Sequence, residues 1–139
     1  MSKSKLFYAR EYGHSTDLVL LLLRLTFGGL MLFNHGWKKM LRLFGDEPIK
    51  FADPFGLGME ATLALAVFAE ILCAALLMLG LFSRWVVIPL IFTMLVAVFV
   101  IHWTDPFGKK EMALLYLVPY IGILLMGAGR YSLDYMLGR

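Results

Sequence analysis

Residues 53–56 and residues 105–108 carry the same four letters, DPFG, and each copy separates two long apolar runs. In this tetrapeptide the Asp side chain can accept hydrogen bonds from nearby backbone amides, Pro presets a turn, and Gly tolerates a positive φ. Each copy therefore predicts a turn between two helices rather than a reaction centre. The doubling predicts two helical hairpins that repeat one architecture.

The composition places these hairpins in a membrane. Of the 139 residues, 60% are hydrophobic and 17% are charged, and the mean hydropathy is +0.78. A soluble domain of this length cannot bury so much apolar surface in its own core. About 20 apolar residues cross the hydrocarbon layer, and the runs that qualify are residues 18–40, 59–81, 85–103 and 111–129. The sequence predicts an all-α polytopic membrane protein, one domain over residues 1–139, with four transmembrane helices as two pseudo-repeated antiparallel hairpins.

The connections between the runs fix the topology. The link between the second and third runs allows only a tight return, so both DPFG loops lie on one side of the membrane and both termini on the other. The hairpin ends are also alike, LMLGLFSRW at residues 77–85 and LLMGAGRYS at residues 124–132. A two-span unit repeated in one orientation implies a pseudo-twofold axis along the membrane normal.

Charge and cysteine content exclude two classes of function. The formal charge is +3, but Lys and Arg lie at the ends of the apolar runs, where they fit lipid headgroups rather than nucleic acid. Excluding Arg24, six lie on each side of the membrane, so the positive-inside rule gives no orientation. The lone Cys73 excludes an intrachain disulfide and a Cys-x-x-Cys redox pair. Small residues around it in the second run leave room for a homodimer.

Two charged residues lie well inside predicted helices, Arg24 in the first and Glu70 in the second. An unpartnered charge inside a bilayer costs ~3 kcal/mol or more. At ~1.5 Å per residue, Arg24 lies ~9 Å and Glu70 ~16 Å from the side of the termini, a gap that an arginine side chain can span. We therefore predict an Arg24–Glu70 ion pair, which either locks two helices together or serves as a proton or substrate relay.

The candidate site lies on the side of the DPFG loops, where four predicted helices begin or end. Its candidate ligand or proton-transfer residues are His35, His102, Glu60, Glu111 and Lys38. Helical spacing places His35 and Lys38 on one inward face of the first helix. His35 and His102 end their helices at similar depth, close to the two glutamates that begin theirs.

Several chemistries fit this group of residues. Two histidines and two carboxylates can bind a transition metal, transfer protons or hold a quinone carbonyl, and two histidines at matched depth also resemble haem b ligands. The same residues can instead cap helices and contact headgroups. No spacing here matches a specific metal motif, so no metal site is predicted. Four aromatic residues are the expected apolar walls of the site: Phe55, Phe107, Trp37 and Trp103.

Three stretches resemble the DoxX family of small prokaryotic membrane proteins. LLLRLTFGGLMLFNHGWKKM at residues 21–40 is similar to the start of the family's sequences. FAEILCAALLMLGLFSRW at residues 68–85 and EMALLYLVPYIGILLMGAGRYSLD at residues 111–134 are similar to later blocks. The family's motif positions correspond here to Arg24, Gly36, Lys38, Glu70, Gly80, Arg84, His102, Glu111, Gly129 and Asp134.

The resemblance implies a four-helix, multi-pass protein of the prokaryotic cytoplasmic (inner) membrane, with its termini in the cytoplasm. The family takes its name from a subunit linked to thiosulfate:quinone oxidoreductase or a terminal oxidase, and some members are associated with oxidative-stress or thiol-redox partners. It favours a quinone- or redox-associated component that works with a redox enzyme partner, with quinone favoured over haem as the ligand. The alternative is a non-enzymatic small-molecule transporter or membrane assembly partner.

Overall fold

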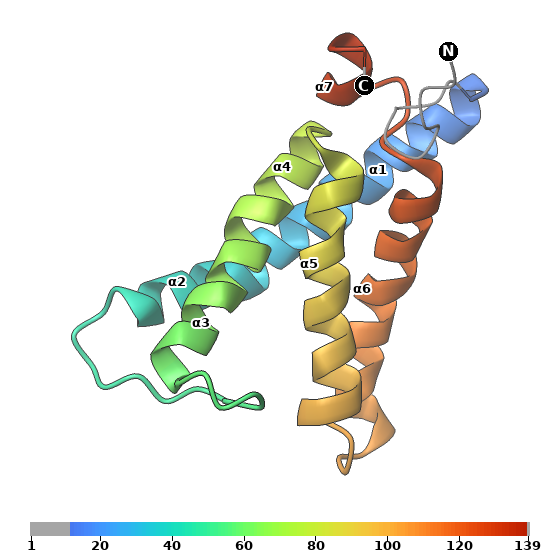
Figure 1. The fold of residues 1–139 in the computed structure, drawn as a ribbon. Coiled ribbons are helices and arrows are strands. Elements are labelled where there is room, and N and C mark those ends of the chain that lie inside the picture. Colours follow the sequence, from blue (N-terminus) through green and yellow to red (C-terminus); the bar gives the residue numbers. More distant parts are fainter. Residues whose placement is uncertain (1–11, 139) are drawn as a thin grey trace.

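A computed structural model describes residues 12–138, and the regular structure within them is helical (Figure 1). Two helices are interrupted by a π-helical turn and a third ends in one; these turns are labelled η. In chain order the elements are α1 (His14–Leu30), η1 (Met31–Gly36), α2 (Trp37–Leu43), α3 (Met59–Val67), η2 (Phe68–Cys73), α4 (Ala74–Leu79), α5 (Ser83–Val96), η3 (Ala97–Ile101), α6 (Phe107–Met126) and α7 (Leu133–Met136).

Three continuous helices are long and apolar enough to cross a membrane: His14–Leu43, Met59–Leu79 and Ser83–Ile101. The prediction of an all-helical membrane protein is therefore confirmed. The expected fourth span is represented by α6, which falls outside this group. Every 18-residue stretch of α6 includes the charged residues Lys109, Lys110 and Glu111. The apolar remainder, residues 112–126, extends about 22 Å, which is less than the ~30 Å of hydrocarbon.

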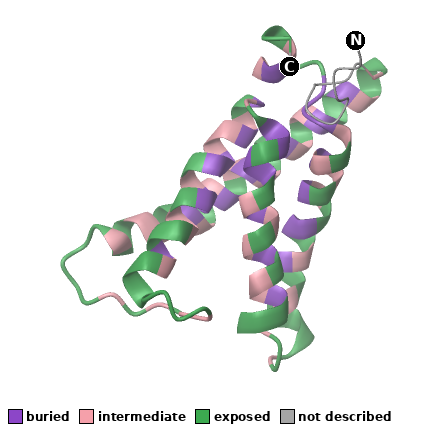
Figure 2. Cartoon of the chain, in the orientation of Figure 1, coloured by how far each residue is buried: buried purple, intermediate pink, exposed green. Residues whose placement is uncertain are grey.

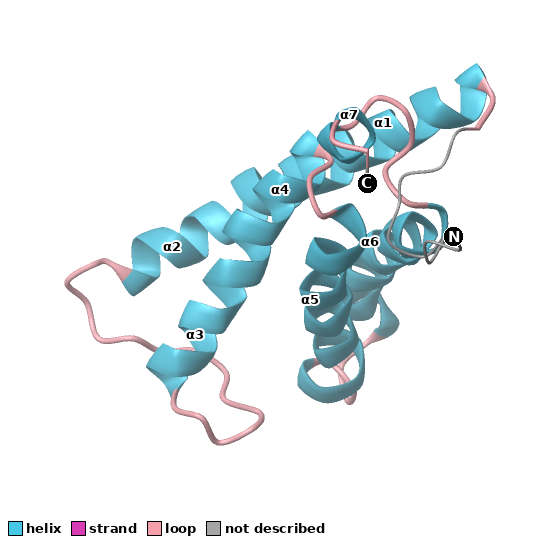
Figure 3. Ribbon diagram, turned by 45° about the horizontal axis from the view of Figure 1, so that its top comes forward, coloured by secondary structure: helices cyan, strands magenta, loops and turns pink. Residues whose placement is uncertain are grey.

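The helices form two hairpins that meet at one end and spread apart at the other (Figures 1 and 3). In the first hairpin α1 packs on α4 and α2 packs on α3; in the second, α5 packs along α6. The hairpins are joined where α5 packs on α4 and η2. The start of α1 and α7 lie at the joined end, and both DPFG loops lie at the spread end, as the sequence predicts (Figure 1).

Buried residues lie mainly between the packed helices, and exposed residues lie on the outer surfaces and in the loops (Figure 2). Leu77, Val87, Leu90, Tyr120 and Ile123 are fully buried where the two hairpins meet. Large apolar side chains on the outer surfaces are exposed, among them Phe33, Phe99 and Val118. An apolar outer surface suits a lipid environment, because a soluble protein of this size rarely exposes so large an apolar area.

The first DPFG copy forms the predicted turn. Gly56 has a φ of 68°. The Asp53 carboxylate accepts hydrogen bonds from the amides of Leu57 and Gly58 at 2.9 and 3.0 Å and from the Thr62 hydroxyl at 3.0 Å. These partners lie further along the chain than in a simple turn, so Asp53 also ties the loop to the first turn of α3.

The second DPFG copy has a different structure, and the predicted turn glycine is wrong there. Pro106 is the N-cap of α6, and Gly108 lies inside this helix rather than at a positive φ. Proline suits this position because its fixed φ and missing amide fit the start of a helix. The amide of Asp105 closes a turn with the His102 carbonyl at 3.1 Å, and its carboxylate pairs with the His102 ring rather than with amides that follow it.

Candidate functional site

A cavity of about 550 Å³ opens where the hairpins spread apart. This volume lies within the range of small-molecule sites in proteins. The first helical pair and its loop line one wall, and α5, η3 and α6 line the other. Most of the lining side chains are apolar. The ionisable ones discussed below are His35, Lys39, Glu70, His102, Lys109 and Tyr116.

All three π-helical turns lie at the cavity. His35 lies in η1, Glu70 lies in η2, and His102 directly follows η3. A π-helical turn accommodates an extra residue in the helix and is found preferentially at functional sites. The turns therefore mark the level of the molecule at which regular helical spacing is broken and polar side chains enter the cavity.

The structure corrects the prediction for Lys38. Lys38 and Lys39 follow His35 by three and four residues, and both spacings share one helix face with it. Lys39 lines the cavity, and Lys38 is exposed outside it.

Lys39 and Glu70 form an ion pair in the cavity wall. Lys39 Nζ lies 2.6 and 2.8 Å from the two carboxylate oxygens of Glu70. The Glu70 side chain is 1% exposed and the Lys39 side chain 25% exposed. The ammonium also lies over the ring of Phe51, 5.8 Å from its centroid. Glu70 thus has the partner that a buried carboxylate requires, while Lys39 remains accessible from the cavity.

Close helix packing brings this pair together. A Cβ atom on Gly36 would lie 2.7 Å from the backbone oxygen of Glu70, so only glycine allows the first and second helices to approach here. Gly28 makes a similar approach to Ala74 and Met78 further along the same helices. These two contacts set the register in which Glu70 faces Gly36 and Lys39.

The predicted ion pair between Arg24 and Glu70 is therefore wrong. Arg24 lies ~18 Å from Gly36 along the helix at 1.5 Å per residue, which is too far from Glu70. Its Nη1 donates to the Met78 carbonyl at 3.3 Å and its Nη2 to the Tyr131 carbonyl. Met78 lies at the C-terminal end of α4, so Arg24 lies at the level of that end, whereas Glu70 lies in η2 further along the same helix.

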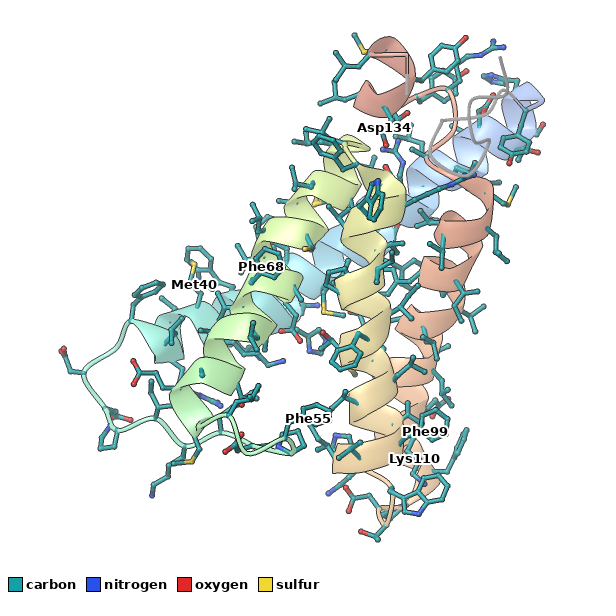
Figure 4. The ribbon with its side chains drawn as sticks, viewed as in Figure 1. Met40, Phe55, Phe68, Phe99, Lys110 and Asp134 are labelled. Carbon is teal, nitrogen blue, oxygen red and sulfur yellow. The ribbon has the colours of Figure 1, made fainter. Side chains whose placement is uncertain are left out.

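Arg24 belongs to a second group of buried charges at the joined end of the hairpins. We call Asp17, Arg24, Arg84 and Asp134 the terminal polar cluster; their exposures are 0%, 0%, 6% and 7%. Asp134 accepts hydrogen bonds from the amides of Phe82 and Ser83, and Asp17 accepts one from the amide of Arg130. Asp134 lies beside the turn that joins α4 to α5 (Figure 4).

The two arginines of this cluster occupy equivalent positions in the two hairpins. Arg24 binds the carbonyl of Met78, and Arg84 binds that of Leu125 at 3.2 Å. Each carbonyl precedes by two residues a glycine with positive φ that follows the helix, Gly80 at 71° and Gly127 at 83°. The hairpin ends that are alike in sequence are thus also alike in structure.

His35 and Tyr116 form the aromatic part of the cavity wall. Their rings meet edge to face, with centroids 5.5 Å apart and an interplanar angle of 89°. Tyr116 is 7% exposed and also contacts Phe27 and Tyr120 through its ring. His35 is thereby held against the second hairpin rather than against lipid.

His102 lies in the cavity wall of the second hairpin, bonded to a carboxylate outside the helix. Its Nδ1 lies 2.8 Å from Asp105 Oδ2. Because an ionised carboxylate only accepts hydrogen bonds, Nδ1 carries the proton of the neutral ring and Nε2 presents its lone pair. The hydrogen bond from His102 holds the pKa of Asp105 below its ordinary value, with Lys109 and Lys110 adding to the effect.

Comparison with known proteins identifies the family. The sequence model of the DoxX family matches residues 19–103, which is more than half of the chain. The chain belongs to the DoxX family. No curated protein and no solved structure matches it significantly. The matched segment of this DoxX protein contains His35, Lys39, Glu70 and His102.

The other predicted site residues lie outside the cavity of the DoxX protein. Glu60 and Glu111 are exposed, and neither lines the cavity. Of the four predicted aromatic walls, Phe55 lines the cavity. Trp37, Trp103 and Phe107 are exposed by 47%, 60% and 66% and point elsewhere. Within residues 12–138, no group of three or more His, Cys, Asp or Glu side chains is placed to hold a metal.

Three residues of the site are absent from the sequence-based prediction: Lys39, Tyr116 and Asp105. Lys39 is four residues after His35, a spacing that shares one helix face. Asp105 is three residues after His102, within reach of its ring, so both signals were present in the sequence. Tyr116 gives no comparable signal, because one tyrosine among several in an apolar helix is typical of a core.

Proposed function

We propose that this DoxX-family protein crosses the membrane four times and binds a quinone-like amphipathic ligand in the cavity between its hairpins. In this proposal α6 is the fourth span. Its packing along α5 supports this, as do the outward side chains of Leu115, Val118 and Leu125, which are 60%, 69% and 66% exposed. Lys109 and Lys110 would then lie among the headgroups at the start of the helix.

The observation that carries the proposal is a cavity with apolar walls and polar side chains on both hairpins. Lys39 supplies an N–H donor on one wall, and His102 supplies a ring nitrogen on the other. A quinone carbonyl oxygen would accept a hydrogen bond from Lys39, and a hydroxyl group of the reduced, quinol form would donate one to the His102 nitrogen. The tail of either form requires an apolar environment. A few polar groups in a largely apolar pocket are what orient such a ligand.

The cavity also has a route for a ligand from lipid. Phe68 of η2 and Phe92 of α5 both line it, and they are 48% and 57% exposed at the outer surface. In the membrane these two side chains would face lipid tails, so the ligand would enter between η2 and α5. A redox enzyme partner would supply the electron-carrying cofactor, and the protein would reside in the prokaryotic cytoplasmic (inner) membrane.

A matched pair of substitutions tests this site. Ala66 and Ala64 lie on the same helix, but Ala66 lines the cavity and Ala64 is exposed outside it. We expect Ala66→Phe to weaken binding of decyl-ubiquinone by about tenfold or more, equivalent to ~1.4 kcal/mol. Ala64→Phe should bind as the parent does. Binding is measured with purified protein in lipid nanodiscs, together with the quinone content of its lipid extract.

Two results would contradict the proposal. Equal binding by Ala66→Phe and the parent, both folded, would place the quinone elsewhere. A parent protein that neither binds decyl-ubiquinone nor retains quinone on purification, yet supports uptake of a small molecule, would favour the transporter function instead.

A further inference from the structure

We propose that His102 is a proton acceptor for an acidic hydroxyl group of the ligand in the cavity, and that Asp105 positions it. The inference rests on the proposed function, because it concerns the ligand of the same cavity. It names the class of ligand more closely, as an amphiphile whose head carries a phenol-like hydroxyl group. It also assigns the two ring nitrogens of His102 different tasks.

The geometry of His102 supports this assignment. The ring lines the cavity, and its Nδ1 is 2.8 Å from Asp105 Oδ2. Asp105 thereby fixes the ring's orientation and leaves Nε2 as the nitrogen available to a ligand. A carboxylate bound to one imidazole nitrogen is the arrangement by which enzymes orient a histidine and stabilise the imidazolium formed when the other nitrogen takes a proton.

The backbone holds His102 at the edge of the cavity. It follows η3 directly, and its amide donates to the Ala97 carbonyl at 2.9 Å, five residues earlier. The His102 and Asp105 side chains are 34% and 32% exposed. Asp105 lies in the loop between η3 and α6, so a proton taken from the ligand has a path to water.

The remaining charges of the cavity favour an anionic ligand oxygen. Lys109 of α6 also lines the cavity, and Lys110 lies beside Trp103, over its ring. Across the cavity, the charges of Lys39 and Glu70 offset each other. Lys109, which acts electrostatically on Asp105, is therefore the cavity cation that favours an anionic oxygen near His102.

The proposed step is a simple proton transfer. The proton leaves the ligand hydroxyl and binds Nε2 of His102, which becomes an imidazolium held by the Asp105 carboxylate. The ligand oxygen becomes an anion beside the lysines. No bond between heavy atoms forms or breaks, and no electrons are exchanged.

A coloured probe reports this step directly. A 4-nitrophenol with a long alkyl chain partitions into membranes and is strongly yellow only as the phenolate. In nanodiscs that contain the protein, we expect the pH at which half the bound probe is ionised to fall by about one unit relative to empty nanodiscs, a tenfold change in its proton affinity. Asp105→Asn and His102→Gln should each lose most of this shift.

Asp46→Asn is the matched control, because Asp46 is an exposed aspartate in the other loop on the same side of the molecule. It should retain the full shift. Nitrogen-15 NMR of histidine provides a second readout, practicable because the chain has 3 histidines. His102 of the ligand-free parent should carry its proton on Nδ1, and Asp105→Asn should lose this preference.

The possible outcomes separate the two proposals. A probe that binds and ionises equally in the parent, Asp105→Asn and His102→Gln overturns the proton acceptor alone. So does a His102 ring protonated on Nε2 in the parent. Binding of decyl-ubiquinone without any binding of the nitrophenol overturns the phenol-like ligand class and leaves the quinone site intact. Failure of the parent to bind either probe overturns the proposed function.

Discussion

The terminal polar cluster and the Lys39–Glu70 ion pair satisfy their buried charges in different ways. In the terminal polar cluster, Arg24 and Arg84 donate to backbone carbonyls, and Asp17 and Asp134 accept from backbone amides. In the cavity, the buried carboxylate of Glu70 is satisfied by another side chain, Lys39, beside a space of about 550 Å³.

The kind of partner indicates the kind of role. A backbone partner is fixed by the fold, so a charge that binds backbone holds helix ends and hairpins in place. A side-chain partner at a cavity can share its hydrogen bonds with a ligand, because it can turn without breaking a helix. We therefore interpret the terminal polar cluster as architecture and the Lys39–Glu70 pair as part of a binding site.

The largest effect is expected from a change in the terminal polar cluster. A Cβ atom on Gly80 would lie 2.1 Å from Arg24 Nη1, and the φ of Gly80 is 71°. Gly80→Ala therefore strains the backbone and displaces a buried guanidinium from its carbonyls. We expect a loss of about 3 kcal/mol or more in the free energy of unfolding, measured by denaturation in detergent.

Gly122→Ala is the control for this change. Gly122 lies inside α6, and a Cβ atom there would meet nothing within 4 Å. Alanine is the better helix former by ~1 kcal/mol, so this variant should be as stable as the parent or slightly more stable. If Gly80→Ala were equally stable, Arg24 would not be packed against Gly80 and the architectural interpretation would fail.

A smaller effect is expected from the cavity ion pair, because Lys39 is partly accessible. Glu70→Gln leaves Lys39 without its carboxylate, and Lys39→Met leaves a buried carboxylate without its cation. We expect either change to cost up to ~3 kcal/mol, at the lower end of the range for breaking a buried pair. The double variant should recover much of the loss. Chemical denaturation of the four proteins gives the coupling energy.

Two controls distinguish this pair from its neighbours. Lys38→Met removes an exposed lysine and should change stability by less than ~0.5 kcal/mol. Arg24→Met combined with Glu70→Gln should be additive, since Arg24 and Glu70 have no shared partner. Strong coupling between Arg24 and Glu70, with none between Lys39 and Glu70, would reverse the assignment of partners made from the structure.

The sequence predicted the helices, the tight turn between the two hairpins and the common side of the DPFG loops. Hydropathy and turn residues are local signals, and they suffice for these features. The partners of the buried charges depend on the register between helices. Gly28 and Gly36 set that register through close contacts with the second helix, and the register places Lys39 rather than Arg24 beside Glu70. Spacing along the first helix could indicate that Lys39 shares a face with His35, but it could not show that Glu70 of another helix is its partner.

The two DPFG copies also show that a local sequence does not determine which partners its side chains find. After Asp53 the chain continues as a loop, and the free amides of Leu57 and Gly58 take up its carboxylate. After Asp105 the chain enters α6 at once, and the carboxylate binds His102 instead. Identical letters thus give a turn in one place and a carboxylate paired with a cavity histidine in the other, because the structure that follows each copy differs.

The smallest effect is expected at the edge of the cavity, where the first loop contacts the second hairpin. Phe55 stacks on Phe92 of α5 with ring centroids 6.1 Å apart, and Figure 4 shows it reaching from the loop toward that helix. An aromatic pair of this kind contributes ~1 kcal/mol, so Phe55→Ala should speed the release of decyl-ubiquinone about fivefold without unfolding the protein. Release is measured by rapid dilution of loaded nanodiscs into empty ones. Phe44→Ala, in the same loop and 79% exposed, should release the quinone at the parent rate. If the two variants behave alike, the ligand leaves by another route. The first loop would then have no part in retaining a ligand at the open end of the molecule.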